Sequence, residues 1–244
     1  MPGYDIKVST LAIDGAADLQ IRSLLDNDQF ADPAGAAEAL GISSAQWPLF
    51  GQVWPSGLHL AAAMAVRPLP EGERILEIGC GLALASLVCH RRGAEVTASD
   101  IHPLAGAFLL ENLRLNELAP MRYCHGDWSE DAVAAVDGAP RVQGRFDLII
   151  GSDVLYERDD GGALAAFIDK HALPRCELLI VDPNRGNRAA FTRRMAALGF
   201  GFSETALVAQ AGQADYRGRL MRFARDAQPA EAEGAPAPAD GRVR

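Results

Sequence analysis

The sequence has few of the residues that build metal centres or disulfide frameworks. Its four cysteines form no CxxC pair and show no zinc-type spacing to histidine: Cys80, Cys89, Cys124 and Cys176. A zinc site and a disulfide scaffold are therefore not indicated, and a reducing cytoplasm suits these thiols. We expect a functional site without a metal.

Long hydrophobic runs are also missing. The longest notable one, LAAAMAV at residues 60–66, is too short to span a bilayer. The first ten residues, MPGYDIKVST, lack the basic and apolar regions of a secretory signal. No repeat of fixed period occurs, which argues against solenoids and propellers. These absences predict a soluble, cytoplasmic protein without a membrane partner.

Basic residues are in the minority. Twenty-three Lys and Arg stand against thirty-two Asp and Glu, for a formal net charge of −9. This balance disfavours a nonspecific grip on nucleic acid, so we expect no nucleic-acid partner. A basic protein partner or a neutral small molecule fits the charge better. Nothing in the sequence indicates an oligomeric state.

The pattern that is present is an alternation of short strand-like and longer helix-like segments. Hydrophobic residues make up 49% of the chain, close to the average of globular proteins. The five strand candidates span residues 74–79, 95–100, 121–126, 146–153 and 177–182. They predict an α/β fold with a doubly wound, mostly parallel sheet. Segments 201–209 and 216–224 are expected to add an antiparallel edge hairpin, which makes seven strands.

The two ends of the chain depart from this alternation. Residues 1–50 form a predicted N-terminal extension that is partly helical, with helical patterns at 18–26 and 33–41. Residues 51–225 form the predicted main domain. Residues 226–244, rich in Ala, Pro and Gly, predict a disordered tail.

A glycine turn with a spaced acid is the first motif that points to chemistry. EIGCG, residues 77–81, lies between a strand and a helix, where glycine permits positive φ and close approach of a ligand. Asp100 ends the next strand, 21 residues after Gly79, where a carboxylate can accept both hydroxyls of a ribose. Its alternative role is to cap the following turn. Leu84 replaces the small residue of a dinucleotide fingerprint, which argues against a nicotinamide cofactor.

The third strand candidate ends in GDW. Asp127 is placed to accept from the exocyclic amine of adenine, while the Trp128 ring covers the purine face. With the glycine turn and Asp100, these residues predict a nucleoside ligand.

Read in order with SDVLYE at residues 152–157, these motifs resemble class I S-adenosylmethionine-dependent methyltransferases. More narrowly, they resemble the seven-β-strand protein-lysine methyltransferases that carry a DxxY motif after the fourth strand. WPLFGQVWPSG, residues 47–57, predicts a turn-rich, irregular lead-in, and the overlapping FGQVWPSGLHLA, residues 50–61, is similar to that family's tryptophan-proline segment before the first strand. The resemblance extends from about Trp47 to Phe223 and implies S-adenosyl-L-methionine as the cofactor.

The resemblance also implies roles for individual residues. Asp153 matches the acid that faces the acceptor, and Tyr156 shares the site; these two form the predicted catalytic set. A carboxylate favours the charged form of an amine, so Asp153 is assigned a binding role first and a proton-accepting role second. Its alternative is to cap a helix near residue 159. The predicted cofactor-binding set is Trp54, Glu77, Gly79, Cys80, Gly81, Asp100, Asp127, Trp128, Ser152 and Tyr156.

Two positions leave alternatives open. Ala83 stands where the family commonly has a third glycine, so we expect cofactor binding to survive provided that φ of Ala83 is negative. After the fifth strand candidate, Asp182, Asn184, Arg185 and Arg188 either line the acceptor pocket or form an ordinary turn.

The predicted function is methyl transfer to a protein side-chain amine, with lysine first. The alternatives are a small-molecule methyltransferase on the same scaffold and a nucleotide-binding module without catalysis. Methyltransferases of adenine amines or glutamine amides resemble one another in an Asn- or Asp-Pro-Pro-aromatic sequence, where this chain has SDVL. Residues 1–50 are a candidate for acceptor selectivity.

Overall fold

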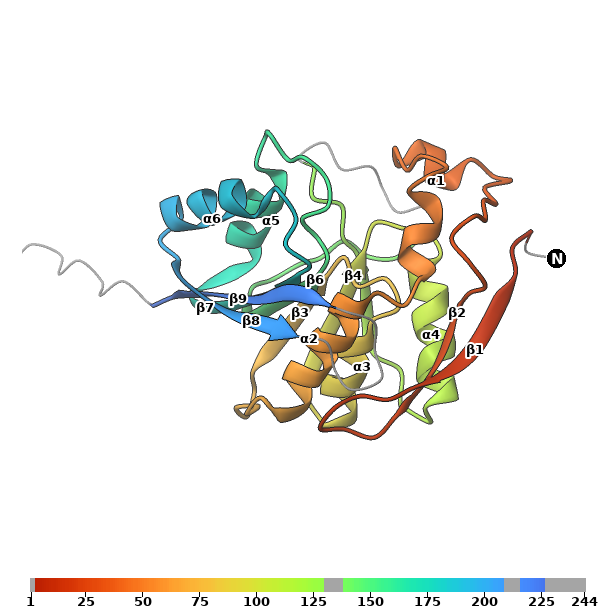
Figure 1. Ribbon diagram of the computed structural model, residues 1–244, viewed down its shortest axis with the longest axis horizontal. Helices are drawn as coiled ribbons and strands as arrows, with labels where there is room; N and C mark the ends of the chain where they lie inside the picture. The colour runs from red at the N-terminus through yellow and green to blue at the C-terminus, as the bar shows by residue number, and fades with distance from the viewer. Residues whose placement is uncertain (1–2, 130–137, 209–215, 227–244) are drawn as a thin grey trace, which may run out of the picture.

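The computed structural model describes residues 3–129, 138–208 and 216–226 of the chain. Its main sheet has the strand order β5-β4-β3-β6-β7-β9-β8 (Figure 1). Neighbours from β5 to β7 pair in parallel, while β9 is antiparallel to both β7 and β8. The predicted doubly wound sheet with an antiparallel edge hairpin is therefore confirmed. The strands are β3 Arg74–Ile78, β4 Glu95–Asp100, β5 Arg122–His125, β6 Phe146–Ser152, β7 Ala172–Asp182, β8 Gly201–Val208 and β9 Arg217–Arg225.

Helices cover both faces of this sheet because successive side chains of a buried strand point to opposite faces. Leu76 of β3 belongs to a core cluster with side chains of α5 and α6. Its neighbour Ile75 packs in a different cluster with side chains of α2 and α3. The helices are α2 Pro55–Val66, α3 Leu84–Arg91, α4 Ala105–Leu115, α5 Ala163–His171 and α6 Arg188–Ala197.

The N-terminal extension differs from the prediction. The helix expected at residues 18–26 is instead the strand β2, Leu19–Leu24, which pairs antiparallel with β1, Ile6–Leu11. Side chains of α4 supply the hydrogen bonds that favour the strand. Asn112 Oδ1 accepts from the Arg22 N–H at 2.8 Å, and Asn116 Oδ1 accepts from the Gln20 N–H at 3.0 Å. Figure 1 shows this hairpin lying along α4.

The rest of the extension is only briefly helical. Of the helical pattern at residues 33–41, only α1, Ala36–Ala39, is an α-helix. The segment expected to be an irregular lead-in contains a short 3-10 helix, η1, at Trp47–Gly51, followed by the start of α2. Proline at the first positions of both helices explains this, because its fixed φ suits a helix start.

The C-terminal tail predicted to be disordered lies outside the described residues, apart from Asp226. Among the residues that the structure describes, no helix has the length and apolar character needed to cross a membrane.

Candidate cofactor and acceptor site

A cavity of about 700 Å³ opens at the carboxyl ends of the parallel strands. It lies where β3 meets β6, which is the point at which the strand order reverses. Open parallel sheets bind their ligands at such a point. All eleven residues predicted for the site line this one cavity: Trp54, Glu77, Gly79, Cys80, Gly81, Asp100, Asp127, Trp128, Ser152, Asp153 and Tyr156.

The glycine turn after β3 has the backbone that its sequence suggests. Gly79 and Gly81 have φ of 54° and 50°. A β-carbon on Gly81 would lie 2.9 Å from the carbonyl oxygen of Phe50, so only glycine lets η1 approach this closely. The Cys80 N–H donates to the Ser99 carbonyl at 2.9 Å, which ties the turn to β4.

Ala83 does not meet the condition of a negative φ. Its φ is 59°, in the left-handed region, directly before α3. Ala83 is fully buried, and its N–H donates to the Cys80 carbonyl at 2.6 Å. The tight 80–83 turn therefore imposes this backbone whether or not the residue has a side chain. Of the two alternatives for Ala83 the structure has the positive φ, and the chain carries the left-handed penalty of roughly 1–2 kcal/mol at this position.

Two buried acids brace the turn. Glu77 accepts the Ser86 N–H at 2.8 Å, and burial raises the pKa of Glu77 to about 7. Asp100 accepts the Gly81 N–H on one oxygen and the His102 N–H on the other, each at 2.8 Å. Burial raises the pKa of Asp100 as well. The turn-capping alternative for Asp100 is thus present, yet each carboxylate oxygen can accept a second hydrogen bond from a ligand.

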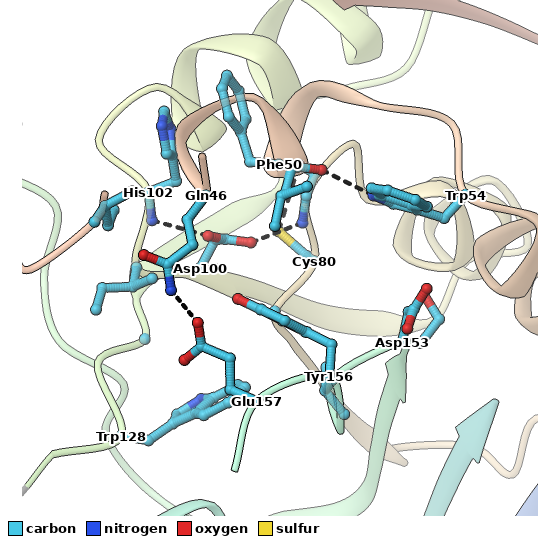
Figure 2. A pocket seen from close by; sticks show the side chains of 18 of the residues that line it. Gln46, Phe50, Trp54, Cys80, Asp100, His102, Trp128, Asp153, Tyr156 and Glu157 are labelled. Carbon is cyan, nitrogen blue, oxygen red and sulfur yellow. Dashed lines mark hydrogen bonds between the residues drawn. The ribbon is translucent and has the colours of Figure 1, made fainter. Parts of the chain in front are cut away.

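The aromatic side chains mark two ends of the cavity. In Figure 2, Trp128 and Glu157 lie on one side, Trp54 and Asp153 lie on the other, and Tyr156 lies between them. Trp128 sits beside the glycine turn, because a β-carbon on Gly79 would be 3.6 Å from its ring. The buried Trp128 Nε1 has no partner among the described residues, so it is a free donor beside the cavity.

Asp153 is held at the other end. It follows β6 directly, has φ of 56° and donates its N–H to the Val181 carbonyl at 2.8 Å. Its Oδ1 accepts from Arg185 Nε at 2.6 Å. The helix cap considered for Asp153 is supplied instead by Asp159, whose Oδ1 accepts the Ala163 N–H at 2.9 Å. Asp153 is therefore free of a capping role.

Tyr156 is an uncharged hydroxyl at neutral pH. Desolvation, together with the negative charges of Glu157, Asp100 and Asp153, raises the pKa of Tyr156 to about 12. It can therefore donate or accept a hydrogen bond, but it does not serve as a base near neutral pH.

The part of the cavity wall that the sequence did not predict comes from residues 40–52, which we call the N-terminal cover. Gln46 Nε2 donates to the Glu157 carboxylate across the cavity (Figure 2). Phe50 stacks on His102. The i, i+3 spacing of Trp47 and Phe50, both buried, was the one sequence signal for this packing. The other wall residues of the cover are Leu40, Gly41, Ile42, Leu49 and Gln52.

Of the four residues noted after the fifth strand candidate, Arg185 alone lines the cavity. Within residues 3–129, 138–208 and 216–226, no group of three or more His, Cys, Asp or Glu side chains has the arrangement of a metal site.

This sheet order, with the glycine turn after β3 and an acid at the tip of β4, is the architecture of class I methyltransferases. A family model described as a methyltransferase domain matches residues 52–225, and the chain belongs to that family. The predicted membership among S-adenosylmethionine-dependent methyltransferases is confirmed at this level. The narrower protein-lysine group is a matter for the proposed function.

Curated relatives and solved structures agree with this assignment. The electron transfer flavoprotein beta subunit lysine methyltransferase of Mus musculus is 27% identical over 152 residues, 61% of this chain and 54% of its own length. The histone-arginine methyltransferase METTL23 of Rattus norvegicus is 29% identical over 120 residues, 48% and 51% of the two chains. The chain spans about half the length of the curated relatives it matches.

The magnesium protoporphyrin IX methyltransferase of Synechocystis PCC 6803, crystallised with bound S-adenosylmethionine, superposes with a TM-score of 0.53. It is 17% identical, and the match covers 70% of this chain and 78% of that one. At this identity the likeness shows the fold alone.

Proposed function

We propose that the protein transfers a methyl group from S-adenosylmethionine to the side-chain amine of a protein, with lysine as the acceptor. The observation that carries this proposal is a single cavity that holds the glycine turn and Asp100 at one strand pair and Asp153 at the neighbouring strand tip. The relatives named for lysine and arginine methylation support a protein nitrogen as the acceptor.

The residues around the glycine turn fit this cofactor. When bound, S-adenosylmethionine supplies an electrophilic methyl group on a sulfonium. Asp100 offers the remaining lone pairs of a buried carboxylate to ribose hydroxyls, and Trp128 offers a ring and an unpartnered Nε1. A β-carbon on Gly81 would lie 2.9 Å from the Phe50 carbonyl oxygen, so glycine at this position keeps the turn and η1 together at the cavity wall. Trp54, anchored by a 2.8 Å hydrogen bond from Nε1 to the Leu49 carbonyl, closes the cavity from the N-terminal side.

The acceptor half of the cavity fits an amine. Methyl transfer is an in-line displacement, so the protein contributes chiefly by positioning, worth roughly 7–11 kcal/mol of barrier. Asp153 Oδ2 accepts no hydrogen bond from the described residues, while Oδ1 is taken by Arg185. Asp153 is therefore able to accept one hydrogen bond from an incoming nitrogen and orient its lone pair.

The proposal is tested by following the label. The purified full chain is incubated with S-adenosylmethionine tritiated in the methyl group and either purified electron transfer flavoprotein beta subunit or a cell lysate. Label in a protein band, mapped to a lysine by mass spectrometry and missing with Asp153→Ala, supports the proposal. Label only in the small-molecule fraction establishes the small-molecule alternative. Cofactor binding without any transfer favours the non-catalytic module.

We also propose a cytoplasmic location. The support is chemical: all four cysteines are buried and unpaired, as thiols of a reducing compartment are. Fractionation of cells followed by immunodetection tests it, and recovery of the protein outside the cytoplasmic fraction would contradict it.

A further inference from the structure

The segment after β7 holds the segment after β6 through three side-chain contacts. Arg185 Nε donates to Asp153 Oδ1 at 2.6 Å. Asn187 Nδ2 donates to the carbonyl oxygens of Leu155 at 2.9 Å and Glu157 at 2.8 Å. Asp153 and the DxxY segment are thus fixed from a strand that follows them in the chain.

The backbone aims Arg185 at Asp153. Asp182, fully buried at the end of β7, accepts the Arg185 N–H on Oδ1 at 2.7 Å. Asn184 takes a φ of 67° and donates through Nδ2 to the Arg217 carbonyl at 2.8 Å, which ties the turn to β9. The Arg185 side chain is 39% exposed, and that of Asp153 is 11% exposed. The guanidinium therefore reaches inward to the acid from the rim of the cavity.

This pair bears on a difficulty in the proposed reaction. An isolated carboxylate stabilises an ammonium ion, but an ammonium nitrogen has no lone pair and cannot attack the methyl group. A cation on the same carboxylate has the opposite effect, because like charges disfavour a second ammonium beside it. The carboxylate charge of Asp153 is largely offset by Arg185, which leaves a hydrogen-bond acceptor. The other charged groups near this pair are Asp182, whose pKa is raised by burial, with Arg188 beside it, and the acids Glu157 and Asp100 that act on Tyr156.

We propose that Arg185 is a positioning residue that keeps the acceptor amine neutral on Asp153, an inference that rests on the proposed amine acceptor. The ammonium loses one proton to solvent as it enters, and the free amine donates a hydrogen bond to Asp153 Oδ2. The nitrogen lone pair then forms the N–CH3 bond while the S–CH3 bond breaks. The electron pair of the S–CH3 bond stays on sulfur. The positive charge moves from sulfur to nitrogen, and Arg185 neither gains nor loses a proton.

The test uses n-butylamine as a minimal lysine side chain, with the full chain saturated by S-adenosylhomocysteine. Its dissociation constant is measured by calorimetry from pH 7 to pH 9, well below the usual lysine pKa of about 10.4. A site that takes the neutral amine gains affinity about tenfold per pH unit, because the neutral fraction rises tenfold. We expect this slope for the wild-type protein and a change of less than about twofold per unit for Arg185→Gln, which accepts the ammonium.

Two variants serve as controls. Arg185→Lys keeps the charge and is expected to restore at least half of the wild-type slope on a logarithmic scale. Arg158→Gln removes a neighbouring charge that pairs only with the exposed Asp160 among the described residues, and it should keep the full slope. Retained binding of S-adenosylhomocysteine shows that each variant is folded.

Each outcome tests either the role of Arg185 or the proposed amine acceptor. A steep wild-type slope that is lost in Arg185→Gln and kept in Arg158→Gln supports the role of Arg185. Equal slopes in the wild type and Arg185→Gln overturn the role of Arg185 but leave the amine acceptor in place. The same conclusion follows if Arg185→Gln and Arg158→Gln lose the pH slope to the same extent. No binding of n-butylamine to the wild-type protein overturns the amine acceptor itself and, with it, this inference.

Discussion

Phe50 and His102 stack face to face, with ring centroids 3.7 Å apart and 12° between the ring planes. Through this contact the N-terminal cover packs on the residue two positions after Asp100. Burial lowers the pKa of His102 to about 3, so its ring is neutral at physiological pH and packs as an aromatic group. The cover is therefore part of the folded core and not an added flap.

Replacing Phe50 should cost both stability and cofactor affinity. Phe50→Ala removes a buried ring and is expected to lower the free energy of unfolding by about 3–5 kcal/mol. It also frees the cover over Gly81, so S-adenosylmethionine should bind more weakly in calorimetry. Phe202, which is 42% exposed on β8, is the matched control. A loss in Phe202→Ala as large as that in Phe50→Ala would contradict a special role for the stack.

Asp100 and Asp153 should separate binding from turnover. Asp100→Ala removes the acceptor of the Gly81 N–H in the glycine turn and of the His102 N–H after β4, and it should abolish calorimetric binding of S-adenosylmethionine. Asp153→Ala should bind the cofactor nearly as the wild type does but transfer no label. If both variants lost binding equally, the division of roles between the two acids would be wrong.

Glu77 should make stability depend on pH. Its folded pKa of about 7 lies above the ordinary 4.5, so the folded state holds a proton that the unfolded state releases. Stability is therefore full below pH 4.5 and falls as the pH rises through 7. Between pH 5 and pH 8, the unfolding free energy of Glu77→Gln should rise by roughly 2–3 kcal/mol relative to the wild type, as measured by urea denaturation. A constant difference would show that Glu77 is ionised in the fold at both pH values.

Ala83 offers a substitution that should stabilise the protein. Ala83→Gly relieves the left-handed backbone and is expected to raise the free energy of unfolding by about 0.5–1 kcal/mol, after some loss from the buried methyl group. The same change at Ala63, inside α2, should instead cost about 1 kcal/mol. Thermal denaturation of the two variants gives opposite shifts if the positive φ of Ala83 is correct.

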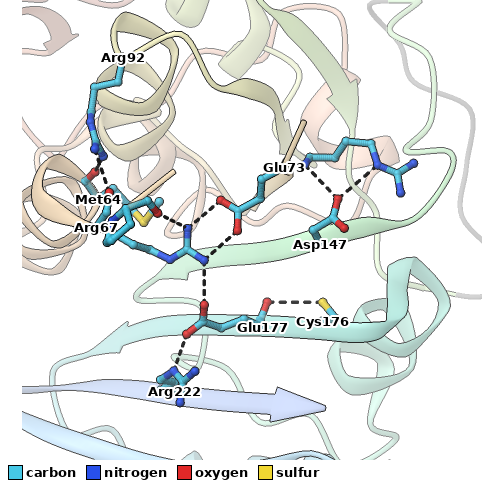
Figure 3. A network of polar contacts seen from close by, with 10 residues as sticks. Met64, Arg67, Glu73, Arg92, Asp147, Cys176, Glu177 and Arg222 are labelled. Carbon is cyan, nitrogen blue, oxygen red and sulfur yellow. Dashed lines mark hydrogen bonds and ion pairs between the residues drawn. The ribbon is translucent and has the colours of Figure 1, made fainter. Parts of the chain in front are cut away.

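A network at the opposite ends of the strands supports the sheet (Figure 3). Arg67 pairs with Glu73 at 2.7 Å and with Glu177 at 2.8 Å, and Arg222 donates to the other oxygen of Glu177. Burial alone would raise the pKa of Glu177, but the two arginines outweigh it and lower that pKa below 4.5.

Glu177 therefore stabilises the fold above pH 4.5, and its contribution is lost as the pH falls through the lowered folded pKa. Glu177→Gln should lower the unfolding free energy at pH 7 by about 1–2 kcal/mol, because two part-buried arginines lose a charged partner. Denaturant titrations at pH 7 and pH 3 check this. A deficit that persists unchanged at pH 3 would point to packing instead of charge.

The parts of the site that the sequence predicted are those set by local pattern. Strand tips follow from apolar runs that end in Gly or Asp, so Gly79, Asp100 and Asp153 could be placed at one sheet edge before any coordinates. The strand β2 could not be predicted in this way, because the groups that satisfy its backbone, Asn112 and Asn116, lie about ninety residues further along the chain.

Two features of the site could not be predicted from the sequence. The φ of Ala83 follows from the hydrogen bond that closes the 80–83 turn, and residue type alone does not reveal it. The N-terminal cover depends on a tertiary stack of Phe50, which lies in the predicted lead-in, on His102, which lies far from it in the chain. A local hydrogen bond decided the first case, and a non-local contact decided the second.

The register of β3 on β6 has a mechanical consequence. Ile78 pairs with Gly151 in the parallel ladder, one residue before the glycine turn on one strand and two before Asp153 on the other. The separation between Gly79 and Asp153 is thus spanned by paired strands, although more than seventy residues separate the two in the chain. Insertions in the connections between these strands can reshape what enters the cavity while the distance between the two strand tips stays the same.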